Sequence, residues 1–109
     1  MTEDKELKYY EWFVDANWQD IPSKLFLAVS YGGECGELLN EIKKEHRGKY
    51  RQPQIMDELG DNLYYLVKLI HTYGYTVSDI MKTNISKLET RRRDNERVQE
   101  FTPEDKGHI

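Results

Sequence analysis

Two short stretches of the sequence each place two acids three residues apart, beside glycine and leucine. They read GECGEL at residues 33–38 and DELGDNL at residues 57–63. The first stretch supplies Glu34 and Glu37, and the second supplies Glu58 and Asp61. On a helix, residues three apart are separated by about one turn, so each pair presents both carboxylates on one face. Such a face can bind a hard cation.

Carboxylates at the edge of an apolar surface repel one another unless a cation shares their charge. The repulsion raises some pKa values and costs stability. Ligation by oxygen alone favours Mg²⁺, with Mn²⁺ as the alternative ion, and neither pair offers the Glu-x-x-His step of di-iron bundles. Because Mg²⁺ binds phosphate oxygens, a phosphate-bearing substrate suits the site. The plainer alternative is a solvated helix edge whose acids pair with neighbours such as Asn40, Lys44 or Lys68.

The first half of the chain has the apolar spacing and boundary residues of two helices. Residues 4 to 16 carry apolar side chains at helical spacing and predict the first helix. The segment NWQDIPS interrupts it. Pro22 suits the first turn of a second helix, with Ser23 beside it, and this long helix is expected to end near Gly48.

The second half predicts two more helices and then a polar tail. Residues 53 to 73 form the third helix, and Gly74 ends it. Thr76 and Asp79 resemble a capping box at the start of a fourth helix. The tail, from about residue 93 to 109, has few apolar residues and is expected to fray. The sequence therefore predicts one all-α domain over residues 1–109, an antiparallel bundle of about four helices completed by oligomerisation.

The acids are expected to border the apolar stripes of the second and third helices. Successive helical residues turn by about 100°. Around the second helix, one side of Glu34 holds the apolar side chains, and the other side holds Glu37 and Glu41. Around the third helix, Asp61 and Tyr65 lie together on the side of Glu58 away from the leucines. Packing the two helices would bring four carboxylates to a common rim: Glu34, Glu37, Glu58 and Asp61.

The overall charge excludes some partners. The 109 residues carry a net charge of −4, which argues against nucleic acid and against a polybasic membrane anchor. The start of the sequence, MTEDKELKYYEWF, is charged and lacks the apolar run of a signal peptide. No stretch of about 18 apolar residues occurs, so we expect a cytoplasmic protein with no membrane partner.

At the acidic stretches the sequence resembles the MazG-like family of all-α nucleoside triphosphate pyrophosphohydrolases. The family pattern places E-x-x-E on one helix and E-x-x-D on the next, and it stands here as GECGEL and ELGDNLYYL. Asn84-Ile-Ser-Lys87-Leu, followed by Arg91, is similar to the third element of the family. The similarity covers roughly residues 18 to 92.

The resemblance implies cleavage of the α–β phosphoanhydride of (deoxy)nucleoside triphosphates to a monophosphate and pyrophosphate, as housekeeping of the nucleotide pool. It also implies that the metal ligands of the site are the two acid pairs, Glu34, Glu37, Glu58 and Asp61. One of the acids would also take the proton of the attacking water. We expect Glu37 in that role, with Glu41, one turn later on the same face, as the alternative.

The remaining substrate contacts are assigned to basic and aromatic side chains. Lys87 and Arg91, with Asn84 one turn earlier, are placed to hold β and γ phosphate oxygens. Trp18 corresponds to a tryptophan that some family members place against the base, and Tyr65 lies at the azimuth of the acids. Either ring can instead belong to the core.

Two alternative functions stay open. The first is a related enzyme activity on the same scaffold, that of an all-α dUTPase or a phosphoribosyl-ATP pyrophosphohydrolase. The second is a non-catalytic role, as a metal-free helical interaction or regulatory protein whose acidic rim docks a basic partner. Family members are usually dimers or tetramers, so the resemblance also implies a homodimer or homotetramer.

Overall fold

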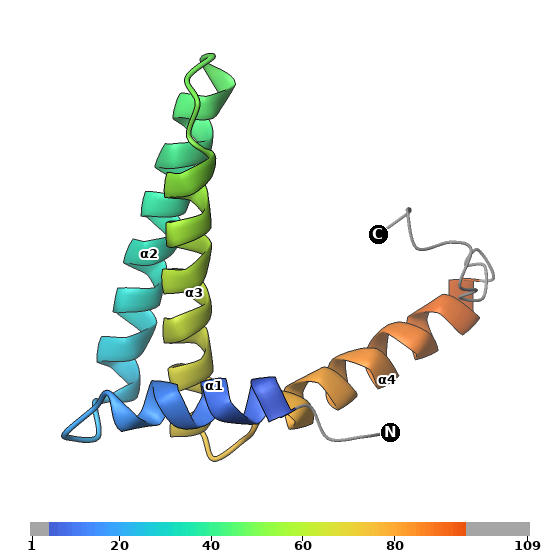
Figure 1. Ribbon diagram of the computed structural model, residues 1–109. Coiled ribbons are helices and arrows are strands. Elements are labelled where there is room, and N and C mark those ends of the chain that lie inside the picture. Colours follow the sequence, from blue (N-terminus) through green and yellow to red (C-terminus); the bar gives the residue numbers. More distant parts are fainter. Residues whose placement is uncertain (1–4, 96–109) are drawn as a thin grey trace. The chain divides into compact units, whose positions relative to one another are not determined.

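The computed structural model describes residues 5–95, and four helices account for most of that range, with no strand in it (Figure 1). The helices are α1 Lys5–Ala16, α2 Lys24–His46, α3 Gln52–Thr72 and α4 Val77–Asn95. The predicted all-α class is therefore confirmed. The bounds expected for the first and third helices agree with the observed ones to within one residue.

Helix α2 begins at a side-chain cap. Ser23 has an extended backbone, and its Oγ accepts a hydrogen bond of 3.0 Å from the backbone N–H of Phe26. This bond satisfies one of the backbone donors that the first turn of a helix leaves free. The prediction that Pro22 lies within the first turn is wrong, because Ser23 caps the helix and Pro22 precedes the cap.

Two glycines end α2 and α3, as their positions in the sequence predicted. Gly48 has φ of 95° and Gly74 has φ of 85°. The N–H of Gly48 bonds to the carbonyl of Glu45, and that of Gly74 bonds to the carbonyl of His71, both at 2.9 Å. A side chain at either position would be strained in this left-handed conformation.

The chain divides into two compact units, Met1–Val77 and Ser78–Ile109. In the first unit, α2 and α3 run antiparallel along each other, and α1 crosses the end where α2 begins and α3 ends (Figure 1). The described part of the second unit belongs to α4. That helix continues through Asn95, two residues past the expected start of the tail, and residues 96–109 lie outside the described range.

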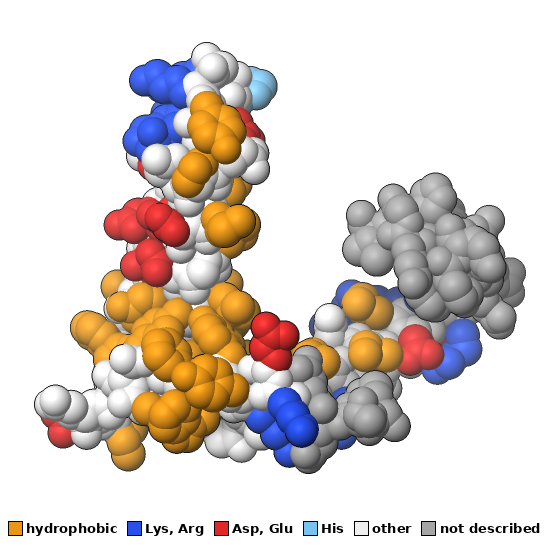
Figure 2. All heavy atoms as spheres, in the orientation of Figure 1, with side chains coloured by type: hydrophobic (Ala, Val, Ile, Leu, Met, Phe, Trp, Pro, Cys, Tyr) orange, Lys and Arg blue, Asp and Glu red, His pale blue; other side chains and the backbone are white. Residues whose placement is uncertain are grey.

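The first unit has a small core. Each of its helices contributes one fully buried side chain: Val14 from α1, Leu27 from α2 and Val67 from α3. Hydrophobic side chains gather where α1 crosses the α2–α3 pair (Figure 2). Along α3, however, Leu59, Leu63 and Leu66 remain 53, 49 and 37% exposed. This apolar stripe, which was expected to face a core, is covered only in part.

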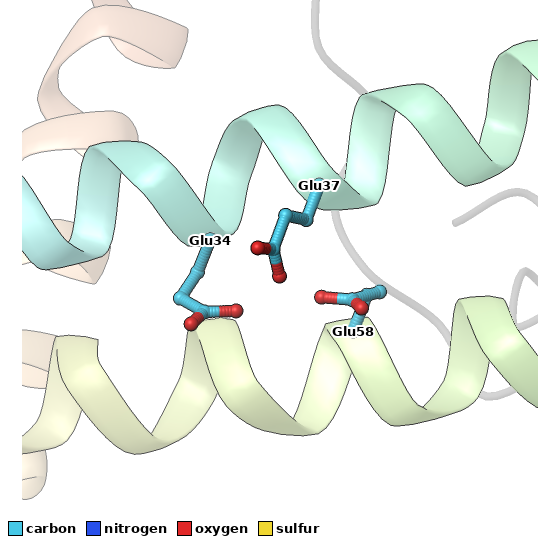
Figure 3. Close-up of side chains that lie close together, drawn as sticks. All are labelled: Glu34, Glu37 and Glu58. Carbon is cyan, nitrogen blue, oxygen red and sulfur yellow. The ribbon is translucent and has the colours of Figure 1, made fainter.

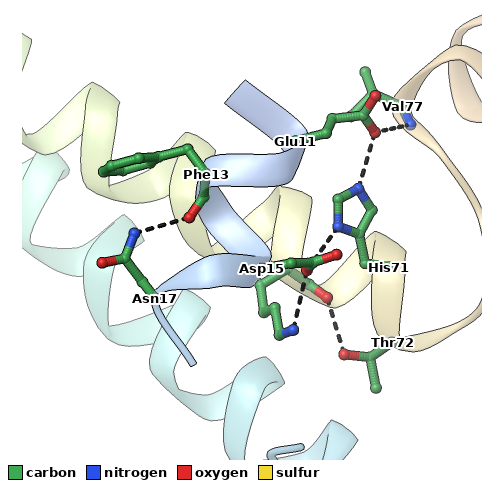
Figure 4. A network of polar contacts seen from close by, with 8 residues as sticks. Glu11, Phe13, Asp15, Asn17, His71, Thr72 and Val77 are labelled. Atoms are coloured by element: carbon green, nitrogen blue, oxygen red, sulfur yellow. Dashed lines mark hydrogen bonds and ion pairs between the residues drawn. The ribbon is translucent and has the colours of Figure 1, made fainter. Parts of the chain in front are cut away.

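A histidine on α3 holds α1 in place (Figure 4). His71 Nε2 lies 2.9 Å from Glu11 Oε1, and His71 Nδ1 lies 2.9 Å from Asp15 Oδ1. Lys68 Nζ donates to Asp15 at 3.0 Å, and the backbone N–H of Val77 donates to Glu11 at 2.8 Å. Burial lowers the pKa of His71, but its hydrogen bonds to the two carboxylates outweigh burial and raise the pKa overall. The protonated imidazole, which can donate from both nitrogens, is therefore favoured.

Helix α4 is amphipathic and largely exposed. Its apolar stripe consists of Ile80, Met81, Ile85 and Leu88, and each of these side chains is between 41 and 55% exposed. Among the helices of residues 5–95, none is both long enough and apolar enough to span a bilayer.

Candidate metal centre

Three of the four predicted acids come together between α2 and α3. Glu34 and Glu37 extend from α2 toward α3, and Glu58 extends from α3 to meet them (Figure 3). Each residue offers one carboxylate oxygen, and these oxygens all lie within 4.8 Å of one another. The two sequence stretches thus meet because α2 and α3 pack side by side in opposite directions.

The fourth acid, Asp61, lies beside this group rather than in it. It is exposed on α3, one turn after Glu58, and its carboxylate is not among the three that converge. Its charge nevertheless contributes to raising the pKa of both Glu34 and Glu58. Asp61 therefore adds negative potential to the site from its edge.

The crowding of the acids perturbs their protonation. Burial is the largest cause that raises the pKa of Glu34 and of Glu58, and the charge of Glu37 is the next largest for both. Each of these groups therefore holds its proton more tightly than a free glutamate does. A bound divalent ion would reverse this preference, because it stabilises the ionised carboxylates.

Two of the carboxylate oxygens lack a partner. Glu34 Oε2 and Glu58 Oε2 are shielded from solvent, and neither accepts a hydrogen bond from any residue in the described part of the chain. A shielded oxygen without a donor costs free energy in a folded protein. A hard cation would supply the missing interaction, so this set of oxygen donors fits Mg²⁺ or Mn²⁺.

An asparagine connects the two helices at the site. Asn62 Nδ2 donates to the backbone carbonyl of Glu34 on α2 at 3.1 Å and to that of Glu58 on its own helix at 2.7 Å. No role was predicted for Asn62 from the sequence. Its position four residues after Glu58 predicts the contact within α3, but the contact to Glu34 depends on how the helices pack.

Glu41, the alternative proton acceptor, is held by two cations. Arg51 Nε lies 2.6 Å from Glu41 Oε2, and Lys44 Nζ lies 3.2 Å from Glu41 Oε1. The hydrogen bond from Arg51 is the largest cause that lowers the pKa of Glu41. Arg51, in the α2–α3 connection, was not identified from the sequence.

The two candidate base-binding rings lie in one aromatic cluster. Trp18 stacks on Tyr64 with 6.3 Å between ring centroids, and it meets Tyr65 edge-on at the same distance. Tyr64 and Tyr65 are themselves 5.5 Å apart. All three rings are half-buried, so they join the segment before α2 to α3. The assignment of Trp18 and Tyr65 to the nucleotide base stays a prediction.

The three predicted phosphate-binding residues all lie on α4. Asn84, Lys87 and Arg91 are exposed and follow one another at intervals of one turn along the helix. They belong to the second compact unit, and their assignment to the phosphates also stays a prediction.

Comparison with known proteins identifies the family. The family model of the MazG nucleotide pyrophosphohydrolase domain matches residues 25–95. This chain belongs to the MazG family. The match includes the acid pairs and α4, whereas Trp18 precedes it. The match agrees with the resemblance noted from the motifs.

One curated relative of this MazG chain comes from a phage. The Gene 37 protein of Mycobacterium phage L5 is 27% identical over 73 residues, which cover 62% of this chain and 64% of that protein. The chain thus matches less than two thirds of the length of this relative. No solved structure matches the chain significantly.

Proposed function

We propose that this MazG domain is a Mg²⁺-dependent pyrophosphohydrolase of the nucleotide pool. It would cleave the α–β phosphoanhydride of (deoxy)nucleoside triphosphates to a nucleoside monophosphate and pyrophosphate. The convergence of Glu34, Glu37 and Glu58 within 4.8 Å, from two helices of a MazG domain, is the observation that supports the proposal. The shielded oxygens of Glu34 and Glu58, which accept no hydrogen bond from the described residues, also support the proposal, because a bound cation would satisfy them.

The position of each acid indicates its role in the proposed reaction. Glu34, Glu37 and Glu58 would hold the ion, with Asp61 completing the site from its edge. When bound, Mg²⁺, or Mn²⁺ in its place, neutralises the triphosphate and lowers the pKa of the attacking water. A carboxylate that already borders the cation can take up the proton of that water.

Glu37 is the better candidate for the proton acceptor. Figure 3 shows its carboxylate between those of Glu34 and Glu58, whereas Glu41 is paired with Arg51 and Lys44. The lowered pKa of Glu41 makes it a weaker base, because a proton acceptor works best when its pKa is near the working pH. Glu41 would instead hold Arg51 and Lys44 near the acids.

We also propose that the chain works as a homodimer or homotetramer. Among residues 5–77, only Val14, Leu27 and Val67 are completely buried, and the leucine stripe of α3 is half exposed. Burial of apolar surface stabilises a fold by about 25 cal/mol per Å², so covering this stripe against a second copy would add substantially to a small core. Light scattering after size exclusion measures the mass, and a monomer at micromolar concentration would contradict the proposal.

The activity is tested with a panel of ribo- and deoxynucleoside triphosphates, assayed with and without Mg²⁺. Pyrophosphate and orthophosphate are quantified separately. The proposal predicts pyrophosphate with the matching monophosphate, only when the metal is present. Orthophosphate alone would show cleavage at another bond, and the absence of product from every nucleotide would favour a binding protein. A preference for dUTP alone would indicate the dUTPase activity.

Two Glu→Gln variants, one inside the site and one outside it, serve as test and control in this assay. Glu37→Gln removes the proposed base from the site. Glu45→Gln makes the same change two turns later on α2, outside the converging group, where the side chain pairs with Gln52. The proposal predicts loss of turnover only for Glu37→Gln.

A further inference from the structure

Repulsion among the acids opposes the close approach of α2 and α3 that the site requires. Glu34 and Glu37 of α2 face Glu58 of α3, and like charges at this distance push the two helices apart. Each carboxylate also ends a flexible side chain, so its position depends on where its backbone is fixed. An attachment between the backbones at these residues would oppose the repulsion.

Asn62 provides such an attachment. Its single amide nitrogen donates to the carbonyls of Glu34 at 3.1 Å and Glu58 at 2.7 Å, the residues whose side chains converge from the two helices. The bond to Glu58 lies within α3 and orients the amide, so that its second hydrogen points at the carbonyl of Glu34 and fixes how closely α2 approaches at this point. Because both partners are carbonyl oxygens, only the NH₂ side of the amide can face them.

We propose that Asn62 is a positioning residue of the cation site. It binds neither metal nor substrate; it holds the backbones of Glu34 and Glu58 so that their carboxylates meet. The proposal rests on the proposed function, because it assumes that the carboxylates bind a divalent ion. Its effect is expected on the affinity for the ion itself, before any nucleotide is present.

The half-buried position of Asn62 supports this role over a purely local one. An asparagine that only bonded to the carbonyl four residues earlier would give α3 no net stabilisation and could do so on any face. Here the side chain lies between the helices and reaches a residue 28 positions earlier in the sequence. A leucine of similar size could fill the same space but would remove the bond that holds the backbone of Glu34 opposite Glu58.

The test measures Mn²⁺ binding by electron paramagnetic resonance, without nucleotide, in the native protein and in Asn62→Leu. Replacing a residue that orients metal ligands typically weakens binding about 10-fold to 100-fold, so the Kd for Mn²⁺ is expected to rise at least about 10-fold. Asn62→Gln, which keeps the amide donors on a longer side chain, should recover part of the affinity. Asn40→Leu, the same substitution at an exposed position of α2, should leave the Kd unchanged.

Circular dichroism melting on the same samples separates positioning from simple stabilisation. If Asn62→Leu melts at a lower temperature but binds Mn²⁺ with native affinity, Asn62 is only structural and the proposal is overturned. If Asn62→Leu does not fold, Asn62→Ala removes the donors without adding bulk and replaces it in the comparison. A native protein that binds no Mn²⁺ would overturn the proposed function as well, so the two failures are distinguishable.

Discussion

The carboxylates of Glu34 and Glu58 lie within 4.8 Å of each other, although different helices carry them. Each has one oxygen that is shielded from solvent and accepts no hydrogen bond within residues 5–95. In the metal-free protein this arrangement is a source of instability. Cation binding and folding are therefore expected to be linked, and the link can be measured without knowing the substrate.

Removing one of the crowded charges should stabilise the metal-free protein. The raised pKa of Glu58 means that the folded state holds this proton more tightly than the unfolded state. Between the usual glutamate pKa and the raised one, the stability contributed by this group therefore falls as pH rises. Glu58→Gln should raise the melting temperature at pH 7, measured in chelator, by a few degrees and flatten this pH dependence. An unchanged or lower melting temperature would contradict the crowding, and Glu45→Gln provides the control.

Mg²⁺ should stabilise the native protein and not its site variants. A ligand that binds only the folded state stabilises it by about 2.7 kcal/mol at 100 times its Kd. Thermal denaturation at increasing Mg²⁺ should show a rising midpoint for the native chain and a nearly flat one for Glu34→Gln. An equal rise in both proteins would place the ion somewhere else.

Turnover should depend on Glu37 more than on Glu41. A positioned general base contributes about 10²-fold to 10⁴-fold to the rate, so Glu37→Gln is expected to lower kcat by that order while the helical signal is retained. Glu41→Gln should have a smaller effect, because Arg51 and Lys44 already occupy its oxygens. Pyrophosphate release under saturating Mg²⁺ gives both rates, and the reverse order would exchange the roles of the two acids.

The attachment of α1 should weaken as the solution becomes alkaline. His71 has a pKa above the usual 6.5, so the stability from its protonated form is fully present below 6.5 and is lost as pH rises through the raised value. Denaturant unfolding across this range should show the decrease. His71→Gln, which does not titrate, should remove this part of the pH dependence. If the variant shows the same slope as the native chain, another group is responsible.

Features that depend on neighbouring residues were predictable from the sequence. The apolar spacing predicted α1, and the positions of Pro53 and Gly74 predicted α3, each to within one residue. Gly48 and Gly74 adopt the positive φ that ends their helices. Pro22 was misplaced because a proline suits both the first turn and the segment before it, and only the hydrogen bond at Ser23 decides between them. The acid pairs were recognisable because their spacing is a property of one helix.

Features that depend on packing were not predictable. Asn62 reaches Glu34 across 28 residues, and His71 reaches Glu11 across 60. His71 follows no ligand spacing in the sequence, so nothing distinguished it from the other histidines. The angular positions of the residues around each helix predicted four acids on one rim. Only the packing of the helices distinguishes Glu34, Glu37 and Glu58, which converge, from Asp61, which lies at the edge. Arg51 lies in the connection between helices, where periodicity gives no direction.

Crystals grown with Mn²⁺ test the central claim most directly, because anomalous scattering identifies the ion without reference to any activity. We expect a peak between α2 and α3, within bonding distance of carboxylate oxygens from Glu34, Glu37 and Glu58. Crystals in which these three side chains bind no ion, while Mn²⁺ occupies another place or none, would contradict the metal centre proposed here.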